Sequence, residues 1–345
     1  MATPYSRNPH VSAEGLLSCV KSDWQTQLRE CFSSGLQLLD FLGVNPADVG
    51  EAEAAAADFP VKVPQSFARR MRRGDPRDPL LLQVLARRYE LDTVPGYSND
   101  PVGESNGVIR RSGVIHKYHG RALLIVTAGC AVNCRYCFRR HFPYAQNRNS
   151  RAEWEQALDY VRSDSSIEEI ILSGGDPLVI TDAHLAELVT QVADIRHVHR
   201  LRVHSRTPVV LPDRVTPALV RTLSSSRLQS VVVIHANHAK EIDASVADAM
   251  RTLRDAGITL LNQSVLLRDV NDNLGALTGL SEALFEASVL PYYLHLLDPV
   301  AGAAHFNVPI EEAQALHREL AAKLSGYLVP RLVREDAGAA GKTLL

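Results

Sequence analysis

The chain has 345 residues, of which 46% are hydrophobic, and its formal net charge is −2. This length suits a large hydrophobic core with an appended region, and the near-neutral charge gives no reason to expect nucleic-acid binding. The first ten residues hold no apolar core of signal-peptide length, and no stretch approaches a membrane span, so we expect no membrane partner.

Residues 1–107 differ from the rest. They hold helical patterns around Trp24 to Leu42, an alanine-rich run at Glu51 to Asp58, and a Pro- and Gly-punctuated stretch from Val94 to Gly107. We interpret residues 1–107 as an N-terminal helical cap region ending in a linker. Cys19 and Cys31 lie in this region without ligand-like spacing, so we predict that they are buried small hydrophobes.

From residue 108 to 330, strand-like and helix-like segments alternate with a period of about thirty residues, which is typical of βα units and a parallel sheet. Six such units predict an α/β fold with a partial (β/α)6 barrel, open on one side. The predicted strands are 121–129, 168–176, 201–206, 230–237, 259–267 and 291–298, and the predicted helices include 152–163, 183–195, 244–257 and 280–288.

In β/α barrels the carboxyl ends of the strands carry the chemistry. We therefore expect the polar residues that end these strands to converge on one mouth. They are Gly174, Gly175, Asp176, His204, Arg206, His235, Asn237, Gln263, Ser264 and Asp298.

Three cysteines, Cys130, Cys134 and Cys137, lie on the loop that leaves the first predicted strand, in the run GCAVNCRYCF. Thiolates hold iron-sulfur clusters, and three ligands would leave one iron of a four-iron cluster open. The alternatives are a zinc site completed by a ligand such as His141, or a redox disulfide between Cys134 and Cys137. Clustered unpaired cysteines and a labile cluster both favour a reducing cytoplasm.

The CxxxCxxC spacing, with the aromatic Tyr136 before the last cysteine, resembles the radical S-adenosylmethionine superfamily. This resemblance implies a 4Fe-4S cluster on Cys130, Cys134 and Cys137, bound S-adenosylmethionine, a deoxyadenosyl radical, and an electron donor such as flavodoxin or ferredoxin. In the same family a glycine-rich element after the second strand holds the methionine amino group. Gly174, Gly175 and Asp176 match it, and we add Gln263 and Ser264 as further candidates for S-adenosylmethionine binding.

The flanks of the cysteine motif, GVIHKYHGRALL and CFRRHFPY, resemble those of lysine 2,3-aminomutases. The resemblance implies pyridoxal phosphate as a further cofactor, with Lys117, Tyr118 and Arg121 at its phosphate. It also implies that Arg139 pairs with the substrate carboxylate, a task suited to a planar two-pronged donor. Without the resemblance, these cations would be interpreted as solvated charges at strand margins.

The tail, residues 331–345, contains REDAGAAGKTLL. By the same resemblance Lys342 is the catalytic lysine that forms an internal aldimine with pyridoxal phosphate. Two acidic residues of the family bind the substrate amine. Asp298 matches the first and Glu335 the second, although the free-lysine enzymes have aspartate there and Asp336 is an adjacent rival.

Several segments, including VPxSF, CAVNCRYCFRRHFPY, NQSVLLRDVND and PYYLHLLD, resemble the compact, zinc-free sub-family often called EpmB. The resemblance covers nearly the whole chain. It implies an isomerase that converts L-lysine to β-lysine by radical amino migration and supplies (R)-β-lysine for modification of elongation factor P by its lysyl ligase. The alternatives are a free-lysine 2,3-aminomutase of amino-acid metabolism and a non-catalytic zinc-binding interaction protein.

Overall fold

The computed structural model describes residues 23–50, 53–104, 109–111, 113–144 and 151–345. Within these residues, ten strands form one sheet whose spatial order follows their order in the chain. The strands are β1 (Ile109–Arg111), β2 (Val114–Tyr118), β3 (Arg121–Thr127), β4 (Glu169–Gly174), β5 (Arg200–Ser205), β6 (Gln229–His235), β7 (Thr259–Val265), β8 (Leu290–His295), β9 (Arg331–Arg334) and β10 (Thr343–Leu344).

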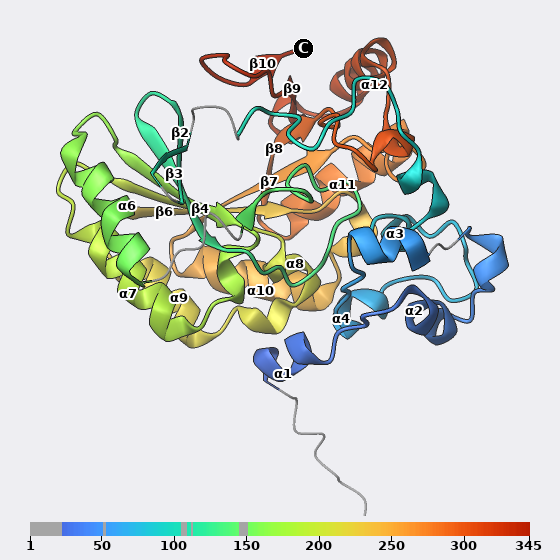
Figure 1. Ribbon diagram of the computed structural model, residues 1–345, viewed down its shortest axis with the longest axis horizontal. Helices are drawn as coiled ribbons and strands as arrows, with labels where there is room; N and C mark the ends of the chain where they lie inside the picture. Colours follow the sequence, from blue (N-terminus) through green and yellow to red (C-terminus); the bar gives the residue numbers. More distant parts are fainter. Residues whose placement is uncertain (1–22, 51–52, 105–108, 112, 145–150) are drawn as a thin grey trace, which may run out of the picture.

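All neighbouring pairs from β3 to β9 are parallel, and the remaining strands join antiparallel at the two edges. The sheet curls into a partial barrel with helices along its outer side (Figure 1). The α-helices are α1 (Trp24–Arg29), α2 (Gly35–Leu42), α3 (Glu53–Asp58), α4 (Gln65–Ala68), α5 (Pro79–Leu82), α6 (Arg151–Ser163), α7 (Asp182–Ala193), α8 (Thr207–Val210), α9 (Pro217–Ser224), α10 (Ala244–Asp255), α11 (Leu274–Glu286) and α12 (Ile310–Lys323).

The predicted partial barrel is confirmed, because the six predicted strands are β3 to β8 and lie parallel in the predicted order. Helix α11 begins six residues before the predicted start at Leu280, at Leu274, because the Asn273 side chain accepts a hydrogen bond from the Ala276 N–H and caps it. The edge strands β1, β2, β9 and β10 were not predicted. They are two to five residues long, too short for a clear period-two pattern.

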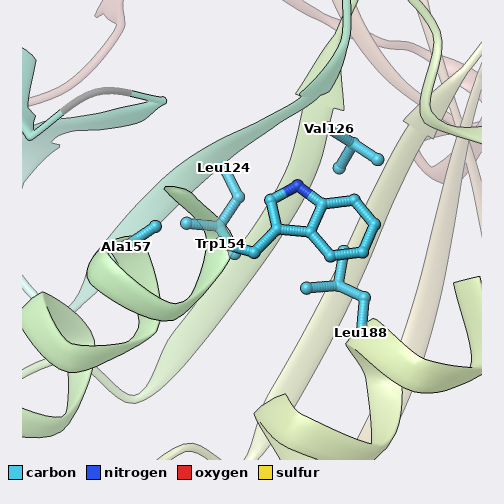
Figure 2. Close-up of a pocket in the computed structure, with 5 residues that line it drawn as sticks. All are labelled: Leu124, Val126, Trp154, Ala157 and Leu188. Carbon is cyan, nitrogen blue, oxygen red and sulfur yellow. The ribbon is translucent and has the colours of Figure 1, made fainter. Parts of the chain in front are cut away.

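The outer helices bury one apolar face against the sheet. Figure 2 shows one such contact, where Trp154 of α6 lies between Leu124 and Val126 of β3 and Leu188 of α7. Leu124, Val126 and Leu188 are almost fully buried. No helix in the described ranges is long and apolar enough to cross a membrane.

The N-terminal helices α1 to α4 lie together at one side of the barrel (Figure 1). Their apolar core is continuous with the cysteine loop, since Ala131 and Val132 pack in the same cluster as Leu38, Val63 and Phe67. Cys31 is partly buried, and burial raises the pKa of its thiol to about 11. Cys19, predicted to be buried, lies outside the described residues.

A buried ion cluster fastens this region to the cysteine loop. Arg135, fully buried, donates to both carboxylate oxygens of Glu90, at 2.8 Å from Nε to Oε1 and 2.5 Å from Nη2 to Oε2. Arg140 Nη1 lies 2.9 Å from Glu90 Oε2. Arg135 also donates to the Phe59 carbonyl oxygen at 2.5 Å, so one guanidinium joins three segments.

Replacing Arg135 with methionine should lower the free energy of unfolding by about 3 kcal/mol, because Glu90 would stay buried with only one cation near it. Chemical denaturation of the metal-free protein measures the change. Arg162→Met is the matched control, since its pair with Asp159 is exposed, and it should cost no more than about 0.5 kcal/mol. Equal small losses in both variants would show that the buried cluster contributes little.

Candidate functional site

A cavity of about 740 Å³ opens at the carboxyl ends of the barrel strands. Its wall comes from the inner face of β2 to β8, the cysteine loop, and the segments around residues 104, 298, 335 and 342. The predicted site residues that line it are Lys117, Tyr118, Arg121, Cys130, Cys134, Cys137, Arg139, Gly174, Gly175, Asp176, Gln263, Asp298, Glu335 and Lys342. The structure therefore brings nearly all of them to one place, although they come from segments far apart in the chain.

Two predicted residues of the mouth, Ser264 and Asn237, do not line the cavity. Successive side chains of a strand point to opposite faces, so Gln263 and Ser264 of β7 cannot both face inward. Ser264 is buried and accepts from Asn262 Nδ2 at 3.2 Å, and Asn237 is buried and donates to Tyr136 Oη at 2.7 Å. The prediction that Asn237 and Ser264 reach the mouth is wrong, whereas Gln263, His204, Arg206 and His235 do line the cavity.

Cys130, Cys134 and Cys137 all line the cavity as free thiols. Burial, together with the neighbouring Cys134, raises the pKa of the Cys137 thiol to about 11. A thiol must lose its proton to ligate a metal, so cluster binding at this loop would release protons. No three His, Cys, Asp or Glu side chains of the described ranges are arranged as ligands of a single ion. Three thiolates would leave one iron of a four-iron cluster open.

His141, the residue expected to complete a zinc site, does not lie beside the three cysteines in the cavity wall. Its Nε2 atom lies 3.3 Å from the Ala301 carbonyl oxygen. Cys134 and Cys137 form no disulfide. Instead, Arg206 Nη1 donates to Cys134 Sγ at 2.8 Å.

The paired glycines at the end of β4 lie so close to neighbouring backbone atoms that a side chain would not fit at either position. Gly174 has φ of +121°, and a Cβ atom there would lie 2.6 Å from the Thr127 carbonyl oxygen. A Cβ atom on Gly175 would lie 2.3 Å from the Gly129 carbonyl oxygen. The two glycines therefore let this turn pack against the start of the cysteine loop, whether or not a ligand approaches them.

Asp176 has no free acceptor for a ligand. Its Oδ1 accepts from the Leu178 N–H and the Ser205 hydroxyl, and its Oδ2 accepts from the Arg206 and Thr207 N–H groups. With four donors on two oxygens, Asp176 ties the ends of β4 and β5 together. Its predicted contact with S-adenosylmethionine would have to break one of these bonds.

Lys117 and Tyr118 of β2 and Arg121 of β3 line the cavity near one edge of the sheet. Arg121 stacks on the Tyr118 ring at 4.7 Å from the ring centroid. Lys117 Nζ donates to the Val102 carbonyl oxygen at 3.1 Å and lies 3.6 Å from Glu335 Oε1. These cations are partly buried beside a cavity and are not the solvated charges that their sequence context suggests.

Lys342 is held in the cavity by strand pairing. Thr343 and Leu344 pair with Arg334 and Val333, which forms a hairpin between β9 and β10. Lys342 Nζ donates to Glu335 Oε2 at 2.8 Å, and the Tyr118 hydroxyl donates to Glu335 Oε1 at 2.5 Å. Burial opposes ionisation of Glu335, but Lys342, Tyr118 and Lys117 together outweigh burial and hold the pKa of this carboxyl below its usual value.

The hairpin separates Glu335 from its rival Asp336. Asp336 does not line the cavity and accepts from Thr343 Oγ1 at 2.6 Å and from Arg334 Nε at 2.8 Å. Glu335 faces the cavity, because neighbouring residues of an extended segment point to opposite sides. Asp298 lines the cavity near Lys342, and burial raises the pKa of its carboxyl to about 7.

Arg139 is buried and its guanidinium is held by the protein itself. Its Nε and Nη2 atoms donate to the two oxygens of Glu104, at 2.7 and 2.8 Å. Its Nη1 atom donates to Ser173 Oγ at 3.1 Å. Sequence reasoning missed Glu104 because it lies in the segment interpreted as a linker, where a single acid among Gly, Pro and Asn gives no signal.

Other lining residues were also missed as binding candidates. Tyr293 and His295 of β8 face the cavity as strand alternation predicts, and Tyr292 lines it as well because the pairing of β8 with β7 is irregular at this point. Lys342 Nζ lies 5.8 Å from the centroid of the Tyr293 ring. His204 Nε2 is buried with no hydrogen-bond partner, and burial holds the pKa of His204 and His295 well below the usual histidine value. Both imidazoles are therefore neutral at the cavity wall.

Comparison with known proteins identifies the family. Residues 124–275 match the model of the radical SAM superfamily. The chain is 51% identical to an L-lysine 2,3-aminomutase of Escherichia coli (strain K12), over 94% of this chain and 95% of that protein. The chain belongs to the L-lysine 2,3-aminomutase family.

Two further members of the L-lysine 2,3-aminomutase family align over most of the chain. The Haemophilus influenzae protein is 46% identical over 94% of this chain and 96% of its own length. The Clostridium subterminale protein is 32% identical over 93% of this chain and 77% of its own length. Membership of the radical SAM superfamily implies a 4Fe-4S cluster and S-adenosylmethionine, which suits the three thiols on one cavity wall.

Proposed function

We propose that this protein is an L-lysine 2,3-aminomutase that uses a 4Fe-4S cluster, S-adenosylmethionine and pyridoxal phosphate to move the α-amino group of lysine to the β-carbon. One observation carries the proposal: the three cysteines and Lys342 line the same cavity. A radical source and an amine able to bind an aldehyde would therefore meet the same substrate.

The cavity wall fits pyridoxal phosphate. Lys117 and Arg121 are the cations we assign to its phosphate, and the rings of Tyr118, Tyr292 and Tyr293 are apolar surfaces that suit its ring. The unpartnered Nε2 of His204 is a buried polar atom that still lacks a hydrogen bond. Lys342 is the residue we assign to covalent attachment of the aldehyde carbon.

The cofactors, when bound, supply a carbon radical that takes hydrogen from the substrate and an aldehyde that carries the migrating amino group. The protein supplies position and shields the site from water. We assign the substrate carboxylate to Arg139 and the distant amine of lysine to Asp298 and Glu335, so the two ends of the substrate would be fixed by opposite charges. Glu335 and Lys342 of the C-terminal hairpin segment and Phe59 of the N-terminal region line the cavity, and we expect these segments to limit the access of water.

The sub-family resemblance supports a narrower proposal, that the enzyme supplies β-lysine for modification of elongation factor P. The alternative is a free-lysine aminomutase, which would catalyse the same reaction but release β-lysine into amino-acid metabolism. Mass spectrometry of elongation factor P from cells with and without this protein separates the two, since only the first proposal predicts that the β-lysyl adduct is lost. The S-adenosylmethionine contacts of Gly174, Gly175, Asp176 and Gln263 also remain predictions.

Anaerobic incubation of the reconstituted protein with S-adenosylmethionine, pyridoxal phosphate, dithionite and L-lysine tests the main proposal. We expect β-lysine, detected by mass spectrometry after derivatisation. Formation of deoxyadenosine without β-lysine would contradict lysine as the substrate but would still support radical cleavage of S-adenosylmethionine. Zinc without iron after anaerobic purification would overturn the enzymatic proposal in favour of a zinc-binding interaction protein.

The pKa of Asp298 predicts a pH dependence. Burial raises this pKa to about 7, so the carboxyl is neutral below that pH and charged above it, while the lysine side-chain amine stays cationic. We expect kcat/KM for L-lysine to fall about tenfold per pH unit below 7 and to level off above it, since kcat/KM reports the free enzyme. In Asp298→Asn the acidic limb should disappear and the plateau should drop. A flat wild-type profile from pH 6 to 8 would contradict this role.

A further inference from the structure

Glu104 holds the guanidinium of Arg139 by one edge. The Glu104 carboxylate accepts from Nε at 2.7 Å and from Nη2 at 2.8 Å, which is the two-pronged geometry of the strongest arginine pairs. Both residues are buried, with 4% and 7% of their surface exposed.

The contact with Glu104 leaves the second edge of the Arg139 guanidinium, between Nη1 and Nη2, for a ligand. Arginine has five N–H donors, and Glu104 takes one from Nε and one from Nη2. Nη1 is 3.1 Å from Ser173 Oγ and only weakly placed at 3.4 Å from the Gly174 carbonyl oxygen. That carbonyl oxygen already accepts from the Tyr144 hydroxyl at 2.8 Å. The edge formed by Nη1 and Nη2 can therefore take a carboxylate without displacing Glu104.

Glu104 is itself fixed on both sides. Its carboxylate lies 3.7 Å from Lys117 Nζ, and its backbone N–H donates to Asp100 Oδ1 at 2.8 Å. Lys117 in turn lies 3.6 Å from Glu335, which accepts from Lys342. Five charges of alternating sign thus run along the cavity from Arg139 to Lys342, with Glu104 between the two cations assigned to different ligands.

We propose that Glu104 is a positioning residue that turns the free edge of Arg139 toward the α-carboxylate of the amino acid substrate. The inference rests on the proposed aminomutase function and deepens it, because it assigns recognition of the carboxylate end to a pair and not to one arginine. Two carboxylates among three cations also limit the positive charge at this wall. Without Glu104 the guanidinium would lose two of its bonds and could rotate away from the substrate.

Glu104→Gln tests the proposal by comparing a ligand that has the α-carboxylate with one that lacks it. The variant should raise KM for L-lysine at least about tenfold, as expected for loss of charge-assisted hydrogen bonds, with kcat changed less than about threefold. Inhibition by 1,5-diaminopentane, which is lysine without its carboxylate, should keep its wild-type constant. Glu104→Asp retains the charge and should give an intermediate KM, and Glu168→Gln, at an exposed pair with Arg200, should match wild type.

The outcomes separate this inference from its premise. A lower KM in Glu104→Gln would overturn the proposal and show that Glu104 competes with the substrate for Arg139. Equal weakening toward L-lysine and 1,5-diaminopentane would also overturn it, by showing a merely structural role. If the wild-type protein makes no β-lysine, equilibrium dialysis with labelled L-lysine still measures the Glu104 effect, so failure of the aminomutase proposal is recorded separately.

Discussion

Replacing Lys342 with alanine should abolish β-lysine formation, with a loss of at least about 10³-fold, the scale seen when a covalent catalytic group is removed. Lys342 is the amine held in the cavity by the β9–β10 hairpin and by its bond to Glu335. Alanine removes the only atom of this side chain that can attach an aldehyde. We expect the variant to lose the visible absorbance of lysine-bound pyridoxal phosphate and to form no β-lysine by mass spectrometry.

The change should be confined to pyridoxal phosphate. Iron content and reductive cleavage of S-adenosylmethionine should stay near wild type in Lys342→Ala, because Lys342 does not contact the cysteine loop in the described structure. Lys323→Ala, at the last residue of α12, is the matched control and should retain full activity. Substantial β-lysine formation by Lys342→Ala would point to another attachment residue or to chemistry without pyridoxal phosphate.

Replacing Cys134 with alanine should remove the cluster, and with it both deoxyadenosine and β-lysine. A four-iron cluster held by three thiolates loses a third of its protein ligands in this variant. Cys134 is also the thiol that accepts from Arg206, so the variant leaves a buried guanidinium without this partner. We expect iron content, the visible absorbance of the reconstituted cluster and deoxyadenosine yield to fall to background.

Cys31→Ala is the matched control for a lost thiol. Cys31 lies close to the loop, with its Sγ 3.9 Å from the Ala131 carbonyl oxygen, but it does not line the cavity. It should keep its iron and its activity. Iron retained in Cys134→Ala would contradict the ligand assignment, and iron lost equally in Cys31→Ala would indicate that the loop tolerates no substitution nearby.

Much of the barrel could be predicted because its signals are local. Each of β3 to β8 is a short apolar run that ends in polar or glycine residues, and helices such as α7 and α10 begin at side-chain caps, Thr181 and Asp243. The cysteine loop is equally local, since three ligands within eight residues need no tertiary information to be recognised. The sequence by itself therefore determined the fold class, the cluster motif and the family resemblance.

The tertiary structure decided which side chains share the cavity and what they contact there. Glu335 and Asp336 are adjacent in the chain, and only the hairpin shows that one faces Lys342 and the other faces Thr343. Gln263 and Ser264 are equivalent candidates in the sequence, and only the orientation of β7 shows that the Gln263 side chain faces the cavity and Ser264 does not. Asp176 carries no free acceptor, and Glu104, in a segment interpreted as a linker, holds Arg139. These are contacts between segments distant in sequence, set by strand direction and burial, so no local pattern of residues encodes them.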